Sequence, residues 1–199
     1  MLRKIVTKFF FVVLFITTAG MLTPGCNKPK SDAGNPRVQI EMEDGGIMVL
    51  ELYPEYAPET VDNFISLAEE GFYNGLTFHR IIKGFMIQGG APNDSSQDVE
   101  TIKGEFAAND FTQNSLKHKK GVISMARTGM SYDSASCQFF IVHGDSPHLD
   151  GDYAAFGKLT EGMDVLDKIA DTPVETNPQN PREVSLPKQE IKIKTITVL

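Results

Sequence analysis

The chain has 199 residues with a formal net charge of −7, and hydrophobic residues make up 41% of it. That composition is typical of a globular protein and excludes disordered and fibrous classes, while the length fits one domain of ordinary size. Outside the first few residues there is no run of Lys or Arg, so we expect no nucleic-acid partner. The two cysteines exclude a disulfide-dense scaffold and a four-cysteine zinc site.

The N-terminus has the pattern of a secretion signal. Arg3, Lys4 and Lys8 precede an apolar stretch, residues 9–19. This stretch is too short for a comfortable membrane span and has the length of a signal-peptide core. It is followed closely by Cys26, with a small residue directly before the cysteine.

That junction resembles the lipobox of bacterial lipoproteins, although Thr23 stands where the motif usually has Leu. We predict a lipoprotein-type signal peptide over residues 1–25, lipidation of Cys26 and a polar tether over 26–36. Residues 37–199 would then form one domain held outside the cytoplasm, at the bacterial cell membrane. An ordinary cleaved signal and an uncleaved anchor are the alternatives.

Apolar alternation or short apolar runs predict eight strands. These are residues 37–42, 46–52, 77–82, 85–89, 121–125, 138–142, 154–159 and 191–199. Helical spacing of apolar residues predicts helices over 59–70 and 162–170. Residues 91–120 are polar and turn-rich, which indicates mostly loop, and residues 171–190, with four prolines, indicate a surface connection.

The eight strand segments show no regular alternation with helices, which disfavours a parallel sheet. Eight short antiparallel strands can close into a barrel and so remove exposed strand edges, although a sandwich also fits the count. Side chains fill the interior of a barrel of that size, so a ligand would bind on an outer face.

Segment 78–90, FHRIIKGFMIQGG, carries the most unusual combination of side chains. A glycine break within it could fold the strands of Arg80 and Gln88 side by side, with Phe85 and Met86 between them. A fixed guanidinium beside apolar and aromatic groups can hold a polar backbone next to an apolar ring. Taken alone, the segment is equally compatible with a surface arginine near two core residues.

Other chemistries have weaker signals. Ser134 or Ser136 with His143 could suggest a hydrolase, but no Gly-x-Ser-x-Gly elbow is present. Cys137 lies before an apolar strand, which favours an inert core thiol. We expect no metal site, because no pair of histidines has HExxH or similar spacing. The histidines are His79, His118, His143 and His148.

Segment 78–90 resembles the signature of the cyclophilins, the cyclosporin-binding class of peptidyl-prolyl cis-trans isomerases. Four further blocks are similar to later family blocks and stand in the same order: TIKGEF (101–106), LKHKKGVISMAR (116–127), DSASCQFFIV (133–142) and PHLDGDYAAFGKLTEGMDVLDKI (147–169). The resemblance covers essentially residues 37–199 and is closest to bacterial members. It implies a mainly β fold, a closed eight-stranded antiparallel β-barrel capped by two α-helices, with an outside groove for an Xaa-Pro segment.

The resemblance also implies roles for individual residues. Arg80 matches the catalytic arginine of the family, and Gln88 matches the residue that helps to hold it. The positions that match the apolar proline pocket are Phe85, Met86, Phe140 and Leu149. The positions that match the stretch that binds the substrate backbone and the residue before proline are Ala126, Arg127 and Gln138.

Two positions depart from many eukaryotic members. His148 stands where they carry Trp, and Tyr153 stands where they carry His. The Trp position is linked to cyclosporin binding, so the resemblance does not carry tight cyclosporin binding over to this chain. Tyr153 can still supply a ring and a hydroxyl to the groove.

We therefore predict a peptidyl-prolyl cis-trans isomerase that acts without a cofactor on proline-containing polypeptides and assists the folding of exported proteins. We expect a monomer that a lipid on Cys26 tethers to the membrane. The alternative is a module that binds proline-containing peptides without turnover, and Arg80 beside the apolar residues argues against it.

Overall fold

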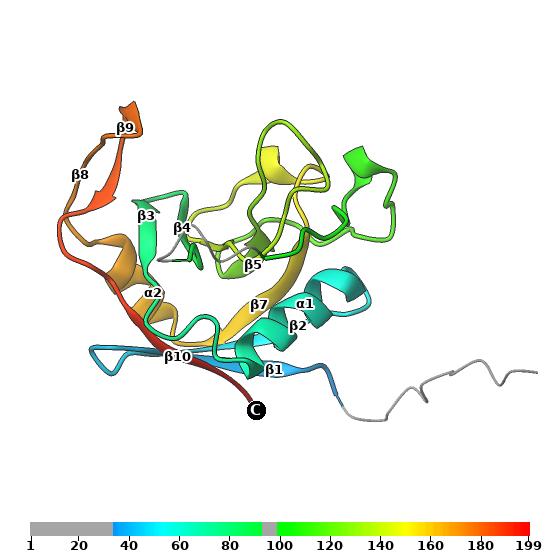
Figure 1. Ribbon diagram of the computed structural model, residues 1–199, viewed down its shortest axis with the longest axis horizontal. Coiled ribbons are helices and arrows are strands. Elements are labelled where there is room, and N and C mark those ends of the chain that lie inside the picture. The colour runs from blue at the N-terminus through cyan, green and yellow to red at the C-terminus, as the bar shows by residue number, and fades with distance from the viewer. Residues whose placement is uncertain (1–33, 93–98) are drawn as a thin grey trace, which may run out of the picture. The chain divides into compact units, whose positions relative to one another are not determined.

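The computed structural model describes residues 34–92 and 99–199. The predicted signal peptide, Cys26 and most of the predicted tether lie outside this part of the chain. The elements follow one another (Figure 1) as β1 (Arg37–Met42), β2 (Ile47–Leu52), α1 (Pro58–Glu69), β3 (Phe78–Ile82), β4 (Met86–Gly89), the short 3₁₀ helix η1 (Ala107–Asn109), β5 (Val122–Met125), β6 (Phe139–Val142), the 3₁₀ helix η2 (Pro147–Leu149), β7 (Ala155–Glu161), α2 (Met163–Ala170), β8 (Val174–Asn177), β9 (Asn180–Pro187) and β10 (Ile193–Val198).

One antiparallel sheet of eight strands forms the body of the domain, in the order β10-β1-β2-β7-β5-β6-β4-β3. Each of its strands coincides with a segment that the sequence pattern predicts. The sheet curls, and the chain just before β3 meets the start of β10 (Figure 1). There Thr77 forms an isolated bridge with Lys192, and the Phe78 backbone N–H donates to the Ile191 carbonyl at 2.9 Å.

The predicted closed barrel is therefore only partly closed. In the described part of the chain no ladder joins β3 to β10, because the chain segments meet only over the few residues ahead of β3. Along the rest of its length β3 lies beside β9, which pairs with β8 in a separate two-stranded sheet. Figure 1 shows this β8–β9 hairpin next to β3. The proline content of residues 171–190 did not predict the hairpin.

Helix α1 is capped at its N-terminus by a residue that is distant in the sequence. It begins at Pro58, as the preference of proline for the first helical turn predicts, but Ala57 before it has no side chain that could cap the helix. The buried carboxylate of Glu105 accepts hydrogen bonds from the backbone N–H groups of Glu59 at 3.0 Å and Thr60 at 2.8 Å. A carboxylate at a helix N-terminus satisfies free N–H groups and favours the helix dipole.

Helix α2 starts after Gly162, whose φ of +87° is strained for any other residue. Its buried face consists of Leu166, Ile169 and Ala170.

In the part of the chain that the structure describes, no helix has the length and apolar character needed to cross a membrane.

The main core lies between α1 and the inner face of the sheet, and Phe64 is at its centre. The apolar stripe of α1 carries this fully buried ring. Its centroid is 5.1 Å from that of Tyr73, 5.4 Å from that of Phe139 and 5.2 Å from that of Phe156. Aromatic pairs at such distances contribute beyond the area they bury, so this cluster ties α1 to β6 and β7.

Replacing Phe64 with Ala removes the ring that the other three contact. We expect the free energy of unfolding to fall by about 3–5 kcal/mol, since the cavity left behind can collapse only in part. Urea unfolding followed by circular dichroism measures the change. Phe72→Ala, at a half-buried ring on the edge of the same cluster, is the control and should cost less. A loss below about 1 kcal/mol for Phe64→Ala would contradict the central role of this ring.

Candidate functional site

Strand β6 faces two apolar environments. Phe139 and Ile141 belong to the main core, whereas Phe140 and Val142 belong to a second buried cluster that also contains Met86 of β4. Because successive side chains of a strand point to opposite faces, the second cluster lies on the outer face of the sheet. The four apolar residues of β6 are explained by burial on both faces.

A cavity of about 140 Å³ opens over this outer cluster. Its lining residues are Arg80, Phe85, Met86, Gln88, Ala126, Arg127, Phe140, Leu149 and Tyr153. Every residue predicted for the groove is among them except Gln138, which lines an adjoining cavity of about 120 Å³. The first cavity is well below the roughly 300–1,000 Å³ of pockets for drug-sized ligands, and it suits one small ring.

A larger cavity, about 390 Å³, lies between the β1–β2 turn and α2 and contains none of the predicted residues. Charged side chains at its rim are paired with one another, Lys168 with Asp44 at 2.7 Å and Lys192 with Glu190 at 2.9 Å. The smaller cavity instead brings a guanidinium and a side-chain amide together over an apolar floor. That convergence is what marks a binding site, so we place the site there.

A β-bulge in β3 aims Arg80. Phe78 pairs with Gly89 and Arg80 pairs with Gln88, so His79 is an extra residue in β3. A bulge redirects the side chains that follow it. The result is that Arg80 stands directly across from Gln88, at the rim of the cavity.

Arg80 is the centre of a row of polar side chains. Its Nη1 donates to Gln88 Oε1 at 3.1 Å, and Gln88 Nε2 donates to Gln138 Oε1 at 3.1 Å. On the other side, its Nε and Nη2 each donate to one carboxylate oxygen of Glu183, both at 2.7 Å. These hydrogen bonds from Arg80 lower the pKa of the Glu183 carboxyl to about 2.

Glu183 is a residue of the site that the sequence pattern does not predict. It lies on β9, within residues 171–190, where the prolines indicated only a connection. No local motif marks it, because its partner Arg80 is 103 positions away in the chain. The one available signal was the short alternation of Glu183 to Leu186, which is typical of a strand.

Aromatic rings form the apolar walls. The Phe140 ring lies on the floor, and the Tyr153 ring meets it edge-on at 5.8 Å. Phe85 packs against His148 with 5.4 Å between the ring centroids, so His148, where the sequence departs from the cyclophilins it resembles, still contacts the wall of the pocket.

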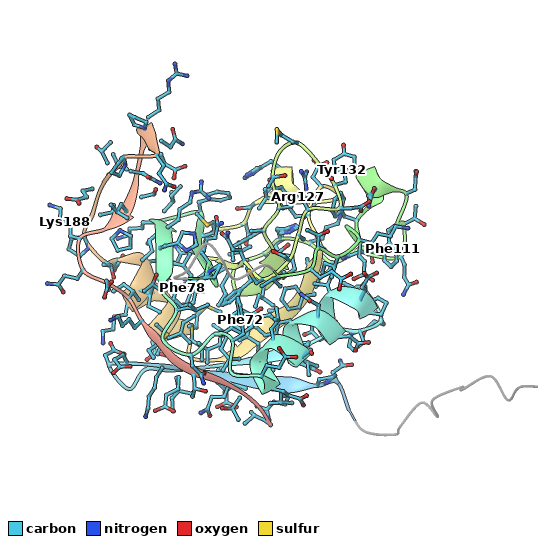
Figure 2. All side chains as sticks on the ribbon, viewed as in Figure 1. Phe72, Phe78, Phe111, Arg127, Tyr132 and Lys188 are labelled. Carbon is cyan, nitrogen blue, oxygen red and sulfur yellow. The ribbon has the colours of Figure 1, made fainter. Side chains whose placement is uncertain are left out.

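Arg127, predicted to lie along the substrate backbone, is itself held by the protein. Its guanidinium lies 4.7 Å from the Tyr153 ring, 5.0 Å from the Tyr132 ring and 5.3 Å from the Phe106 ring, and Figure 2 shows it beside Tyr132. Its Nε donates to the Asp152 carbonyl at 3.0 Å. Cation–π contacts of this kind fix the rings, so the side chain braces the wall that carries Tyr153.

A buried histidine supports the floor. The His118 ring stacks on the Phe140 ring at 6.1 Å, with 16° between the planes. Its Nδ1 lies 3.0 Å from Asp150 Oδ1 and its Nε2 lies 3.1 Å from Ser124 Oγ. Burial lowers the pKa of His118, although Asp150 acts in the opposite direction. Hydrogen bonds at both nitrogens therefore hold the neutral His118 imidazole in place under the Phe140 ring.

The hydrolase interpretation finds no support among the described residues. His143 Nδ1 accepts a hydrogen bond from the Gly84 N–H at 2.8 Å, and its Nε2 lies 3.2 Å from Asp167, away from the candidate serines. The Ser134 hydroxyl oxygen instead accepts hydrogen bonds from the backbone N–H and the hydroxyl of Thr128. The Asp150–His118–Ser124 row has the order of a catalytic triad, but Ser124 is 0% exposed, so no substrate can reach it.

Comparison with known proteins identifies the family. The sequence model of the family of cyclophilin-type peptidyl-prolyl cis-trans isomerases matches residues 37–198 of this chain. The chain belongs to the cyclophilin family. Its activity is accordingly the cis–trans isomerisation of Xaa-Pro bonds.

Among the relatives of this cyclophilin is peptidyl-prolyl cis-trans isomerase B of Bacillus subtilis, 49% identical over 125 residues that cover 62% of this chain and 82% of the relative. A peptidyl-prolyl cis-trans isomerase of Helicobacter pylori is 49% identical over 128 residues, 62% of this chain and 74% of the relative. A crystal structure of a Cryptosporidium parvum cyclophilin, determined in the presence of the dipeptide Ala-Pro, matches with a TM-score of 0.69 and 30% identity. That match covers 82% of this chain and 98% of the other.

Burial of neutral histidines makes the stability of the cyclophilin domain depend on pH. Burial lowers the pKa of both His118 and His79 below the ordinary value of 6.5. Below that value the unfolded chain binds protons that the folded chain excludes. We expect the free energy of unfolding to fall as the pH drops from about 7.5 to about 5.5, in urea titrations at the two pH values.

His118→Gln should flatten this dependence in part, because one of the two excluded protons is then absent. A free energy of unfolding that stays constant over the interval, or rises toward acid, would show that His118 and His79 are not held neutral by the fold.

Proposed function

We propose that Arg80 is the catalytic group of this isomerase and that the substrate's proline ring occupies the cavity over Phe140. The observation that supports the assignment is a guanidinium held at the rim of a small apolar cavity. Met86, Phe85 and Leu149 supply the remaining apolar surface for the ring. The adjoining cavity would take the preceding residue, along the Ala126 and Gln138 side.

The reaction needs no nucleophile and no redox chemistry, because no bond is broken. Amide resonance sets a barrier of about 18–20 kcal/mol, and uncatalysed isomerisation takes roughly 10–100 s. Catalysis must come from binding the twisted amide better than either planar isomer. In the twisted amide the prolyl nitrogen regains a lone pair, to which the permanently charged Arg80 can donate.

One hydrogen bond cannot supply the whole effect. A rate enhancement of about 10⁶ needs roughly 8 kcal/mol of differential stabilisation. A charge-assisted hydrogen bond contributes about 1.5–3 kcal/mol net. The rest must come from holding the ring still over Phe140 while the preceding carbonyl turns, and from a guanidinium that is oriented before the substrate arrives.

We infer that the substrates are exposed Xaa-Pro segments of incompletely folded chains. The dipeptide named for the Cryptosporidium relative is the smallest member of this class, and a cavity of about 140 Å³ suits its ring. Cyclosporin is not among the ligands we assign, because His148 stands at the position that the family's tryptophan takes.

Arg80→Ala tests the catalytic assignment. We expect kcat/KM for an Ala-Pro-Phe test peptide to fall by about a hundredfold in a protease-coupled assay, since a donor aimed at the twisted amide is lost. The full-length chain in detergent micelles is the sample. Arg37→Ala, which removes an exposed arginine of β1 that lines neither cavity of the site, is the control and should keep its activity. Full activity in the Arg80 variant, with an unchanged circular dichroism spectrum, would refute the assignment.

The N-terminal sequence supports a location for this activity. A charged start, an apolar stretch and a cysteine after a small residue support export and lipidation of Cys26. The polar tether would then hold a monomeric isomerase at the outer side of the bacterial cell membrane. Exported proteins whose folding waits for proline isomerisation would be its clients.

Cys26→Ser tests the anchor. In a bacterial host grown with a labelled fatty acid, we expect the native chain to carry label and to sediment with membranes. The serine variant should carry no label, because lipidation needs the thiol of Cys26. Cys137→Ser, at a buried thiol of the domain, should still be labelled. Equal labelling of the native chain and the Cys26 variant, or no labelling of either, would contradict the lipid anchor.

A further inference from the structure

The β8–β9 hairpin brings an acidic side chain onto Arg80. Both carboxylate oxygens of Glu183 accept hydrogen bonds from the guanidinium, from Nε and from Nη2, at 2.7 Å each. The side chains of Arg80 and Glu183 are only 28% and 21% exposed, so water screens the pair weakly. A two-point contact of this kind fixes the plane of a guanidinium as well as its position.

The carboxylate is itself held. The Ser185 hydroxyl donates to Glu183 Oε1 at 2.6 Å, and Ser185 is 0% exposed. Strand β9 lies beside β3 (Figure 1), so the hairpin backbone holds Glu183 and Ser185 close to Arg80. The pKa of Glu183, lowered to about 2 by Arg80, keeps the carboxylate charged at neutral pH.

The pairing leaves Arg80 able to act on a substrate. A guanidinium has five N–H bonds. Glu183 takes one from Nε and one from Nη2, and Gln88 takes one from Nη1. Another Nη1 contact, to the thioether sulfur of Met86 at 3.7 Å, is weak and can be displaced. One N–H on Nη2 and the weakly bound one on Nη1 therefore remain for a ligand in the cavity.

We propose that Glu183, supported by Ser185, is a positioning residue for the isomerase: it fixes the Arg80 guanidinium in the orientation that the twisted amide needs. This inference rests on the catalytic role of Arg80 proposed above. Without Glu183 the guanidinium would be held at Nη1 alone, by Gln88, and could rotate about that contact. Misplacement by about 1 Å can cost a catalytic group much of its effect.

The opposite role has a different signature. If Glu183 held Arg80 back from the substrate, removal of its charge would free the arginine and raise the rate. If Glu183 served only to stabilise the hairpin, its removal would lower the stability and leave kcat unchanged. The three roles can therefore be separated by measuring kcat and peptide binding independently.

Glu183→Gln is the central test, because it keeps the length of the side chain and one carbonyl oxygen while it removes the charge and the second acceptor. We expect kcat/KM of the full-length chain in detergent for the Ala-Pro-Phe peptide to fall on the order of tenfold. The dissociation constant of the peptide, from NMR titration, should change by less than about twofold, since the apolar cavity is intact. The loss then lies in kcat, as expected for an interaction made in the transition state.

Two further variants sharpen the test. Ser185→Ala removes the hydrogen bond that holds the carboxylate and should lower kcat in the same direction by a smaller factor; it carries the test if the Glu183 variant fails to fold. Glu175→Gln makes the same charge change on β8, at an exposed residue of the same hairpin, and should leave kcat unchanged.

A combination of variants shows whether Glu183 acts through Arg80. In an Arg80→Lys background there is no planar fork to orient, so adding Glu183→Gln should change kcat by less than about twofold. An equal loss in both backgrounds would overturn the inference, as would a rate at or above that of the native chain, or a loss carried entirely by weaker peptide binding. Full activity of Arg80→Ala would instead refute the proposed function itself, so the two failures are distinguishable.

Discussion

Strand β6 carries the core on one face and the site on the other, and the rest of the molecule depends on that double burial. Phe139 lies among the rings of the main core, while Phe140, the next residue, forms the floor of the cavity. A shift of register by one residue would exchange the two faces. Because the interior behind β6 is filled with close-packed rings, the floor cannot sink when a ligand presses on it. A fixed floor is what an isomerase needs, since the proline ring must stay still while the preceding amide turns.

On the polar side of the cavity, the charge of Arg80 must be stabilised beside an apolar surface. A partly buried cation loses hydration and must regain it from hydrogen bonds. Arg80 obtains them from Glu183 and Gln88, and Gln88 is held in turn by Gln138. In surroundings of low polarity such a row of hydrogen bonds is stronger than in water, and every member restricts the next. The row thus makes the charge tolerable and limits the orientations of the guanidinium.

Local patterns in the sequence predict most of the fold, and long-range contacts account for what they miss. Alternation or short apolar runs predict each strand of the main sheet, and the ordered family blocks predict the residues that line the cavity. They do not predict that Glu183 meets Arg80 across 103 positions or that Glu105 caps α1 across 45, because a single ion pair or cap has no periodicity. The partly open barrel has the same cause. Alternation predicts strands, but whether Thr77 and its neighbours meet the start of β10 depends on the twist of the whole sheet.

The two arginines that line the cavity show why the type of a residue does not assign its role. Arg127 is enclosed by three aromatic rings, and its Nε and Nη1 donate to backbone carbonyls, so its charge is used to hold a wall in place. Arg80 has no ring over it in the described residues; its partners are a carboxylate and an amide at its edges, which leaves a donor open to the cavity. A carboxylate partner orients a guanidinium without covering its face, whereas stacked rings cover the face and occupy the group. The chemistry of the neighbours therefore separates the arginine that can act on an amide from the one that supports the surface around it.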